Sequence, residues 1–129
     1  MSQPAHRITD ALFDAVQARD VSAVVSCFVP EGSWQNVPEA PAGGHAELRR
    51  LFAPILERSS EVEWELRSAA YEPTRAFVER VDRFVIDGRE RAAHCHGVFE
   101  VDPTSGLLVE VRDYVDLATW RRQLADVRW

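Results

Sequence analysis

The fold of this chain is decided by residues 77–101, FVERVDRFVIDGRERAAHCHGVFEV. The Asp87-Gly88 pair near the middle is a strong signal for the two-residue turn of a β-hairpin. The runs on either side are rich in valine and phenylalanine, which favour strands. We therefore expect two antiparallel strands, from Thr74 to Ile86 and from Arg89 to Val101.

The hairpin turn also determines which side chains face the interior. Counting back from this turn places Asp82 opposite Ala93 and Arg80 opposite Cys95. Ala93 and Cys95 belong to a row of small or apolar residues at every second position of the second strand. Arg80 and Asp82 are therefore predicted to lie on the buried face.

A second buried carboxylate is predicted on the last strand, which we expect from Leu107 to about Val115. One face of that strand carries valines and Asp113. Counting across the preceding turn places Asp113 opposite Cys95, so the Arg80 guanidinium would reach over the small Cys95 side chain to Asp113. Taking ionised groups out of water is costly unless they are paired. The two carboxylates and the guanidinium must therefore either compensate one another or serve a function.

The rest of the chain completes an α+β pattern. Helical spacing predicts a helix from Gln3 to Arg19, a short helix capped by Asp20, and a helix from His45 to Glu57 that Pro54 should kink or shorten. A final helix is capped by Asp116 and contains residues up to Val127. Strand patterns predict a brief strand from Ser33 to Val37 and another strand from Val62 to Ala70. This order predicts one domain over residues 1–129, in which helices cover the concave face of a curved mixed sheet. Such layers can enclose a hydrophobic pocket.

Composition narrows the classes of partner. The chain has 129 residues, 46% hydrophobic positions and a formal net charge of −6. A protein with this charge is not expected to bind a nucleic-acid backbone or an anionic membrane. Cys27 and Cys95 form no motif, and the N-terminus lacks the apolar stretch of a signal peptide, so a cytoplasmic location is expected.

The predicted cluster of Arg80, Asp82 and Asp113 has a chemical interpretation. Two carboxylates that share one cation in a poorly hydrated site can have pKa values that are pushed apart, which gives a base and an acid side by side. Such a pair can activate water and protonate a leaving oxygen. A network that only stabilises the fold is the alternative.

A metal site is not expected. His94 and His96 are separated by one residue, but both have outward parity on the second hairpin strand, and no third ligand stands at supporting spacing.

Three segments together resemble the limonene-1,2-epoxide hydrolase family of the NTF2-like, SnoaL-like superfamily. They are Trp34-Gln-Asn36-Val-Pro38, Glu79-Arg80-Val81-Asp82 and Arg112-Asp113-Tyr114-Val-Asp116. The resemblance covers nearly the whole chain and implies an NTF2-like cone with a six-stranded curved sheet, a deep hydrophobic pocket and a homodimer. It also implies one-step addition of water to a small, lipophilic, cyclic epoxide, without a metal or an organic cofactor.

The resemblance further implies roles for individual residues. Asp113 would be the general base, Asn36 would help to position the water, and Asp82 would protonate the epoxide oxygen. Arg80 would hold both carboxylates and keep their pKa values apart. Trp34 stands where the family usually has a water-binding tyrosine, and its indole N–H can donate one hydrogen bond but accept none.

Further side chains are expected to line the substrate pocket, although for Leu48, Phe52, Phe84 and Trp120 the sequence does not separate a pocket position from a core position. They are large, apolar or small residues on the interior faces of the predicted elements: Trp34, Leu48, Phe52, Phe84, Cys95, Val111 and Trp120.

Two other functions remain open at the level of sequence. A ketosteroid-isomerase-like or polyketide-cyclase-like enzyme would move a proton beside a carbonyl, but it would want an inward phenol. The only tyrosines are Tyr71, near a strand end, and Tyr114, which has outward parity. A non-catalytic domain that binds small hydrophobic molecules is compatible with Trp34, and binding without turnover would distinguish it.

Overall fold

A computed structural model describes residues 3–129 as an alternation of helices and strands. In chain order the elements are α1 (Pro4–Gln17), α2 (Val21–Ser26), β1 (Phe28–Val37), β2 (Ala42–Gly43), α3 (His45–Arg58), β3 (Glu61–Glu72), β4 (Arg75–Ile86), β5 (Arg89–Val101), β6 (Leu108–Val115) and α4 (Leu117–Gln123). None of the helices within residues 3–129 has the length and apolar character needed to cross a bilayer.

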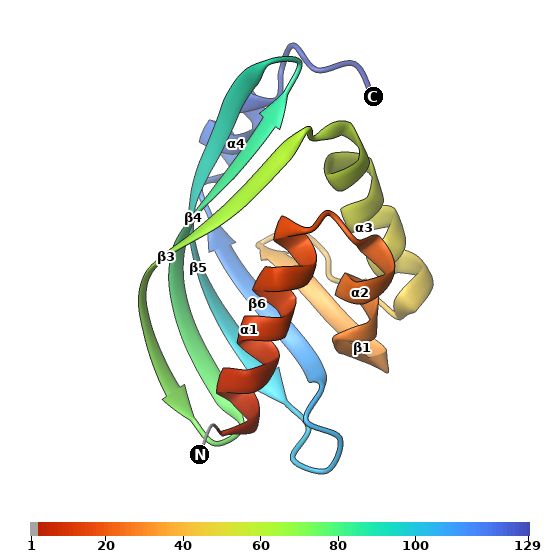
Figure 1. Cartoon of the computed structure of the whole chain (residues 1–129), viewed down its shortest axis with the longest axis vertical. Helices are drawn as coiled ribbons and strands as arrows, with labels where there is room; N and C mark the ends of the chain where they lie inside the picture. The colour runs from red at the N-terminus through yellow and green to blue at the C-terminus, as the bar shows by residue number, and fades with distance from the viewer. Residues whose placement is uncertain (1–2) are drawn as a thin grey trace.

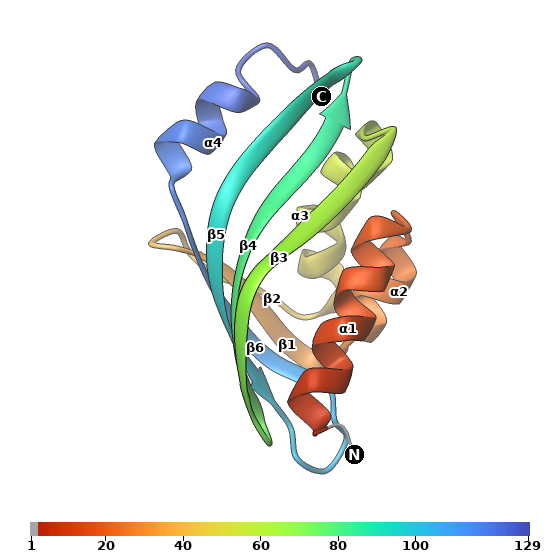
Figure 2. The same cartoon turned by 60° about the vertical axis from the view of Figure 1, so that its left-hand side comes forward.

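The six strands form one mixed sheet in the order β2-β1-β6-β5-β4-β3. Among the strands of residues 3–129, only the β1–β6 pair is parallel. The sheet is curved, and α1, α2 and α3 pack on its concave side (Figure 1, Figure 2). Helix α4 lies near the end of the β4–β5 hairpin that carries the turn (Figure 1, Figure 2). The predicted α+β architecture, with helices over the concave face of a curved mixed sheet, is confirmed.

Local sequence signals explain where the helices begin and which side they bury. Asp20 caps α2 by accepting a hydrogen bond from the Ala23 amide, and Asp116 caps α4 in the same way from the Thr119 amide, as predicted. In α1 the apolar residues recur at helical spacing, and the side facing the sheet is buried.

The β4–β5 hairpin has the predicted turn and register. Asp87 and Gly88 have φ angles of 54° and 73°, the positive values that a type I′ turn requires. Arg80 pairs with Cys95 and Asp82 pairs with Ala93. Arg80 and Asp82 therefore lie on the interior face, as predicted from the turn.

The β5–β6 register differs from the prediction. Asp113 pairs with Gly97, not with Cys95, because Val101 pairs with Leu108 and the next β6 residue, Val109, is left out of the ladder as a bulge. The prediction is therefore wrong by two residues. Since side chains alternate with a period of two, this shift keeps Asp113 on the interior face.

Several element boundaries also differ from the prediction, and one strand was not expected. Strand β1 begins at Phe28 instead of Ser33, because an irregularity in its pairing with β6 accommodates residues 30–32. The two-residue β2 was not predicted. Helix α3 continues through Pro54, since Pro54 and Arg50 are both exposed and water can meet the carbonyl that the proline leaves unpaired. Helix α4 ends at Gln123, and the residues up to Val127 follow it without helical structure.

Candidate functional site

Arg80 is the centre of the buried polar cluster. Its Nε and Nη2 donate to the two oxygens of Asp82 at 2.7 and 3.1 Å, and its Nη1 and Nη2 donate to the two oxygens of Asp113 at 3.0 and 2.8 Å. Arg80 is 1% exposed, Asp82 6% and Asp113 3%. Both contacts are bidentate, the strongest geometry for an arginine and a carboxylate. The structure thus brings together the three charged residues singled out in the sequence.

The Arg80 guanidinium passes over Gly97 on its way to Asp113. A methyl group built on Gly97 would lie 3.1 Å from Arg80 Nη1 and 3.3 Å from Asp113 Oδ1. The corrected register explains this path, because Gly97 and not Cys95 is the β5 residue beside Asp113. The absence of a side chain at position 97 therefore makes room for the ion pair.

Two indole rings pack against the guanidinium. The Arg80 Cζ atom lies 4.4 Å from the centroid of the Trp64 ring and 5.7 Å from that of Trp34. These are cation–π distances, and such contacts gain strength when the cation is removed from water. The cation is thus stabilised by two carboxylates and two aromatic faces.

The carboxyl group of Asp82 has an altered acidity. Burial, helped by the negative charge of Asp113, raises the pKa of Asp82 to about 6, although Arg80 acts in the opposite direction. Burial also raises the pKa of the Cys95 thiol, with a further contribution from Asp82. The protonated thiol donates a hydrogen bond to Asp82 Oδ2, with 3.5 Å between sulfur and oxygen. Asp82 is therefore suited to hold a proton close to neutral pH.

Asn36 reaches the site from β1. It pairs with Asp113 across the parallel β1–β6 ladder. The indole nitrogen of Trp34 donates to Asn36 Oδ1 at 2.9 Å. Because an indole nitrogen can only donate, this bond fixes the amide with its oxygen toward Trp34. The NH₂ group is left as the hydrogen-bonding group that Asn36 offers to a ligand.

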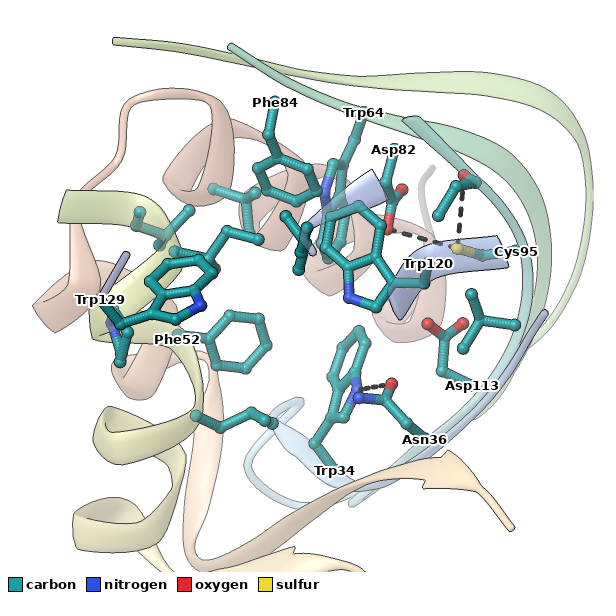
Figure 3. Close-up of a pocket in the computed structure, with 18 residues that line it drawn as sticks. Trp34, Asn36, Phe52, Trp64, Asp82, Phe84, Cys95, Asp113, Trp120 and Trp129 are labelled. Carbon is teal, nitrogen blue, oxygen red and sulfur yellow. Dashed lines mark hydrogen bonds between the residues drawn. The ribbon is translucent and has the colours of Figure 1, made fainter. Parts of the chain in front are cut away.

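Asn36, Asp82, Cys95 and Asp113 border a cavity of about 240 Å³. Its wall is largely apolar and includes all four tryptophans of the chain. In Figure 3, Asp82, Cys95, Asp113 and Asn36 gather on one side of the cavity and Trp129 lies on the other. A mostly apolar cavity with a few converging polar groups is the usual form of a small-molecule site.

Most of the predicted lining residues border this cavity. Trp34, Phe52, Phe84, Cys95 and Trp120 do so.

Leu48 and Val111, by contrast, are 0% exposed and belong to the hydrophobic core. Val111 lies between Trp34 and Phe99 in the sheet, and the rings of these two residues cover it from the cavity. Leu48 lies one helical turn before Phe52 on α3, and the cavity begins only at Leu51. The prediction that they line the pocket is therefore wrong.

Several lining residues were missed in the sequence, and two of them are tryptophans. Trp64 could have been found, because its interior parity on β3 puts it opposite Asp82. Trp129 carried no such signal, since it follows α4 outside any regular element.

The cluster includes one potential set of metal ligands. Within residues 3–129, Asp82, Cys95 and Asp113 can bring one ligand atom each to within 4.8 Å of one another. However, all four carboxylate oxygens accept hydrogen bonds from Arg80. A dication would be repelled by the guanidinium and would have to displace it, so the donor set does not fit a metal.

Comparisons with known proteins agree with this fold. A profile of the SnoaL-like domain family matches residues 9–111. A search of curated proteins found no match. Among solved structures, an LEH-like epoxide hydrolase of M. tuberculosis superposes with a TM-score of 0.78 at 24% identity, covering 95% of this chain and 90% of that one.

Two further structures have the same fold at lower identity. A protein proposed to be a SnoaL-like polyketide cyclase of Shewanella denitrificans OS-217 has a TM-score of 0.82 at 12% identity, covering 95% of this chain and 98% of that one. SalBIII, an epoxide hydrolase/cyclase-like enzyme in pyran ring formation in salinomycin, has a TM-score of 0.78 at 18% identity, covering 89% and 92%. The profile match extends over most of the chain, and this chain therefore belongs to the family of SnoaL-like domains.

Proposed function

We propose that this chain is an epoxide hydrolase of the limonene-1,2-epoxide hydrolase type, which adds water to a lipophilic epoxide and forms a vicinal diol. The observation that carries the proposal is the arrangement of two carboxylates, Asp82 and Asp113, on one buried guanidinium at the wall of an apolar cavity. Structures of the same fold include an LEH-like epoxide hydrolase and an epoxide hydrolase/cyclase-like enzyme, which supports the proposal.

The proposed reaction is a single displacement. Asp113 takes a proton from a water molecule while the water oxygen bonds to one epoxide carbon. The bond from that carbon to the epoxide oxygen breaks, and Asp82 gives this oxygen a proton. The Asn36 NH₂ group donates a hydrogen bond to the water oxygen and positions it. Asp113 ends protonated and Asp82 ionised, and proton exchange with solvent restores both. Positioned acid and base groups each contribute roughly 10² to 10⁴-fold.

The assignment of Asp82 as the acid follows from its surroundings. With its pKa raised to about 6, Asp82 is protonated in a useful fraction of molecules near neutral pH. Turnover is therefore expected to decline as the pH rises above about 6, because the protonated acid becomes scarce. Asp113 is assigned as the base because it stands beside Asn36 in the sheet.

Substitution of the base tests the mechanism. Asp113→Asn should reduce turnover of a cyclic epoxide by at least about 100-fold, since the amide cannot take a proton. Diol formation measured over a small panel of cyclic epoxides is the assay, and circular dichroism checks the fold. Asp102→Asn is the matched control, because Asp102 is a carboxylate in the exposed β5–β6 turn. Full activity of the Asp113 variant would contradict the proposal.

Isotope labelling distinguishes direct attack from an ester intermediate. In a single turnover in H₂¹⁸O, direct attack places the label in the diol and leaves the protein unlabelled. Label in a carboxylate of the protein, detected by peptide mass spectrometry, would instead mean that an aspartate had attacked the epoxide.

The Trp34–Asn36 hydrogen bond favours one alternative. Because Asn36 offers only its NH₂ group, it could equally donate to a carbonyl oxygen while Asp113 removes a neighbouring proton. This is the chemistry of a ketosteroid-isomerase-like or polyketide-cyclase-like enzyme. Exchange of deuterium from D₂O into a cyclic enone, without diol formation from epoxides, would favour it. Binding of both compound classes without turnover would favour a binding domain.

We also propose that the chain forms a homodimer, as the family resemblance implies. Light scattering after size-exclusion chromatography measures the mass, and a value near twice the 14.6 kDa of one chain would support the dimer.

A further inference from the structure

The segment after β6 supplies part of the cavity wall. Segment 117–129 contains α4 and the residues that follow it, and three of its side chains, Trp120, Leu124 and Trp129, border the cavity. In Figure 3, Trp129 lies across the cavity from Asp113. The part of the cavity bordered by Trp120 and Trp129 is called the outer subsite below.

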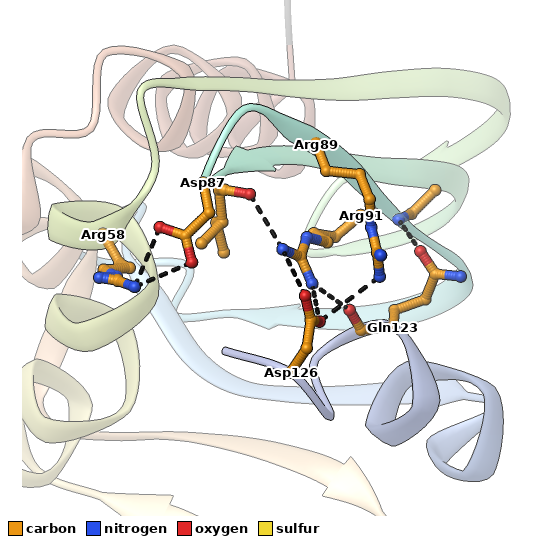
Figure 4. Close-up of polar contacts among 8 residues, drawn as sticks. Arg58, Asp87, Arg89, Arg91, Gln123 and Asp126 are labelled. Atoms are coloured by element: carbon orange, nitrogen blue, oxygen red, sulfur yellow. Dashed lines mark hydrogen bonds and ion pairs between the residues drawn. The ribbon is translucent and has the colours of Figure 1, made fainter. Parts of the chain in front are cut away.

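A buried arginine holds segment 117–129 against the β4–β5 hairpin. Arg91 lies in the interior row of β5 and is 1% exposed. It donates to the Gln123 carbonyl at 2.8 Å, to the Ile86 carbonyl at 3.1 Å and to the Asp126 carboxylate (Figure 4). The Gln123 side chain in turn accepts from the Ala92 amide at 3.1 Å. Because a buried guanidinium is costly to leave unpaired, these bonds fix residues 123–126 in place and thereby position the residues on either side of them.

The aromatic rings near the polar cluster already have partners. The Trp34 ring meets Phe52 edge to face, with ring centroids 5.2 Å apart, and lies 6.0 Å from Trp64. Trp64 also faces the Arg80 guanidinium. These rings form the fixed wall beside the reacting groups.

The rings of the outer subsite have more free surface. Within residues 3–129, no aromatic contact involves Trp129, and this residue is 63% exposed. Trp120 has one ring neighbour in the same range, Phe84, with centroids 5.5 Å apart. Aromatic rings prefer to stack offset or edge to face on other rings, and such pairs contribute beyond simple burial of area.

We propose that the outer subsite of Trp120 and Trp129, held in place by Arg91 and Asp126, binds an aryl group, so that the preferred substrate is an epoxide with a planar aromatic substituent. The epoxide part rests on the proposed function, whereas the aryl preference rests on the outer subsite alone. Arg91 and Asp126 act as positioning residues, since they touch the segment that carries the two indoles and not the ligand.

A matched pair of ligands tests the aryl preference. Phenyloxirane and cyclohexyloxirane differ only in the ring, as do the corresponding unreactive diols, 1-phenyl- and 1-cyclohexylethane-1,2-diol. We expect the phenyl compound to bind the outer subsite ~2- to 10-fold more tightly in each pair. Ligand-observed NMR titration gives Kd for the diols, and initial rates give KM and kcat for the epoxides.

Variants assign the preference to the outer subsite. Trp129→Leu should bring the Kd values of the two diols closer together, because only Trp120 remains, whereas Trp129→Phe should retain the preference for the phenyl diol. Asp126→Asn should also reduce the preference and raise KM for phenyloxirane more than it lowers kcat, because the anchor acts on binding. Arg75→Gln, which disturbs an exposed ion pair of β4 with Glu100, should leave the preference unchanged.

The two proposals fail separately. If no epoxide is hydrolysed but the phenyl diol still binds more tightly and Trp129→Leu reduces that difference, only the proposed function is wrong. If epoxides are hydrolysed but phenyl and cyclohexyl compounds bind equally, the aryl subsite is wrong. A preference of unchanged size in Trp129→Leu would overturn it as well.

Discussion

Gly97 is the residue that sets the path of Arg80 over the sheet. A methyl group at this position would lie 2.7 Å from Phe99 Cε1 and 3.1 Å from Arg80 Nη1. Phe99 is 0% exposed, so its ring has little room to move. We expect Gly97→Ala to lower the free energy of unfolding by about 1–3 kcal/mol, the usual cost of overpacking a core. Urea unfolding followed by circular dichroism measures the change.

A second glycine on the sheet provides the control for this substitution. A methyl group on Gly43 of β2 would meet no atom within 4 Å. Gly43→Ala should therefore change the free energy of unfolding by less than about 0.5 kcal/mol. Equal effects of the two substitutions would mean that crowding at Arg80 is not the cause.

The sequence allowed a residue's face to be predicted more reliably than its immediate neighbours. Arg80, Asp82 and Asp113 were placed inside because strand parity depends only on counting by twos. The prediction that Val111 borders the pocket failed, since parity does not reveal that the Trp34 and Phe99 rings cover it. The orientation of a large side chain depends on packing partners from several elements, and no local pattern encodes it.

The β4–β5 turn is the element that aligns Arg80 and Asp82 with the interior row of β5. Gly88 has a φ of 73°, a left-handed conformation that costs other residues roughly 1–2 kcal/mol, with asparagine as the mildest case. We expect Gly88→Ala to lower the free energy of unfolding by about 1 kcal/mol and Gly88→Asn to lower it less. Urea unfolding of both variants measures this, and an alanine variant as stable as the parent would contradict it.

The turns differ in how well they could be predicted. Asp87-Gly88 specifies both the turn type and the register, so counting along the β4–β5 hairpin succeeded. The β5–β6 turn is longer and is followed by a bulge at Val109, and neither its length nor the bulge has a clear sequence signal. The position of segment 117–129 was also out of reach, because it depends on the contact between Arg91 and Asp126 from distant parts of the chain.

At the scale of the whole molecule, folding places the Arg80, Asp82 and Asp113 cluster inside with unbalanced charge. With Arg80 protonated and both Asp82 and Asp113 ionised, the cluster carries one excess negative charge in a poorly hydrated place. Taking up one proton removes the excess, and the raised pKa of Asp82 describes this uptake. The feature that equips Asp82 as an acid therefore also connects folding to pH.

The pH dependence of stability follows in sign from this connection. The pKa of Asp82 is about 6 in the folded protein, above its ordinary value of about 3.9. The folded state holds this proton more tightly than the unfolded state does, so the stabilising contribution is fully present below about pH 4 and is lost as the pH rises through 6. Over that window the loss is on the order of 3 kcal/mol.

A comparison with Asp82→Asn isolates this contribution. Other carboxyl groups act in the opposite direction, such as Asp126, where the hydrogen bond from Arg91 lowers the pKa, but both proteins share them. The difference in unfolding free energy, parent minus variant, should therefore fall as the pH rises from 4 to 7, as measured by urea unfolding at each pH. If Asp82→Asn does not fold, infrared spectroscopy of the parent should still record loss of one protonated carboxyl signal near pH 6. A difference that stays constant with pH, or a carboxyl signal already absent at pH 5, would show that Asp82 remains ionised and could not be the acid.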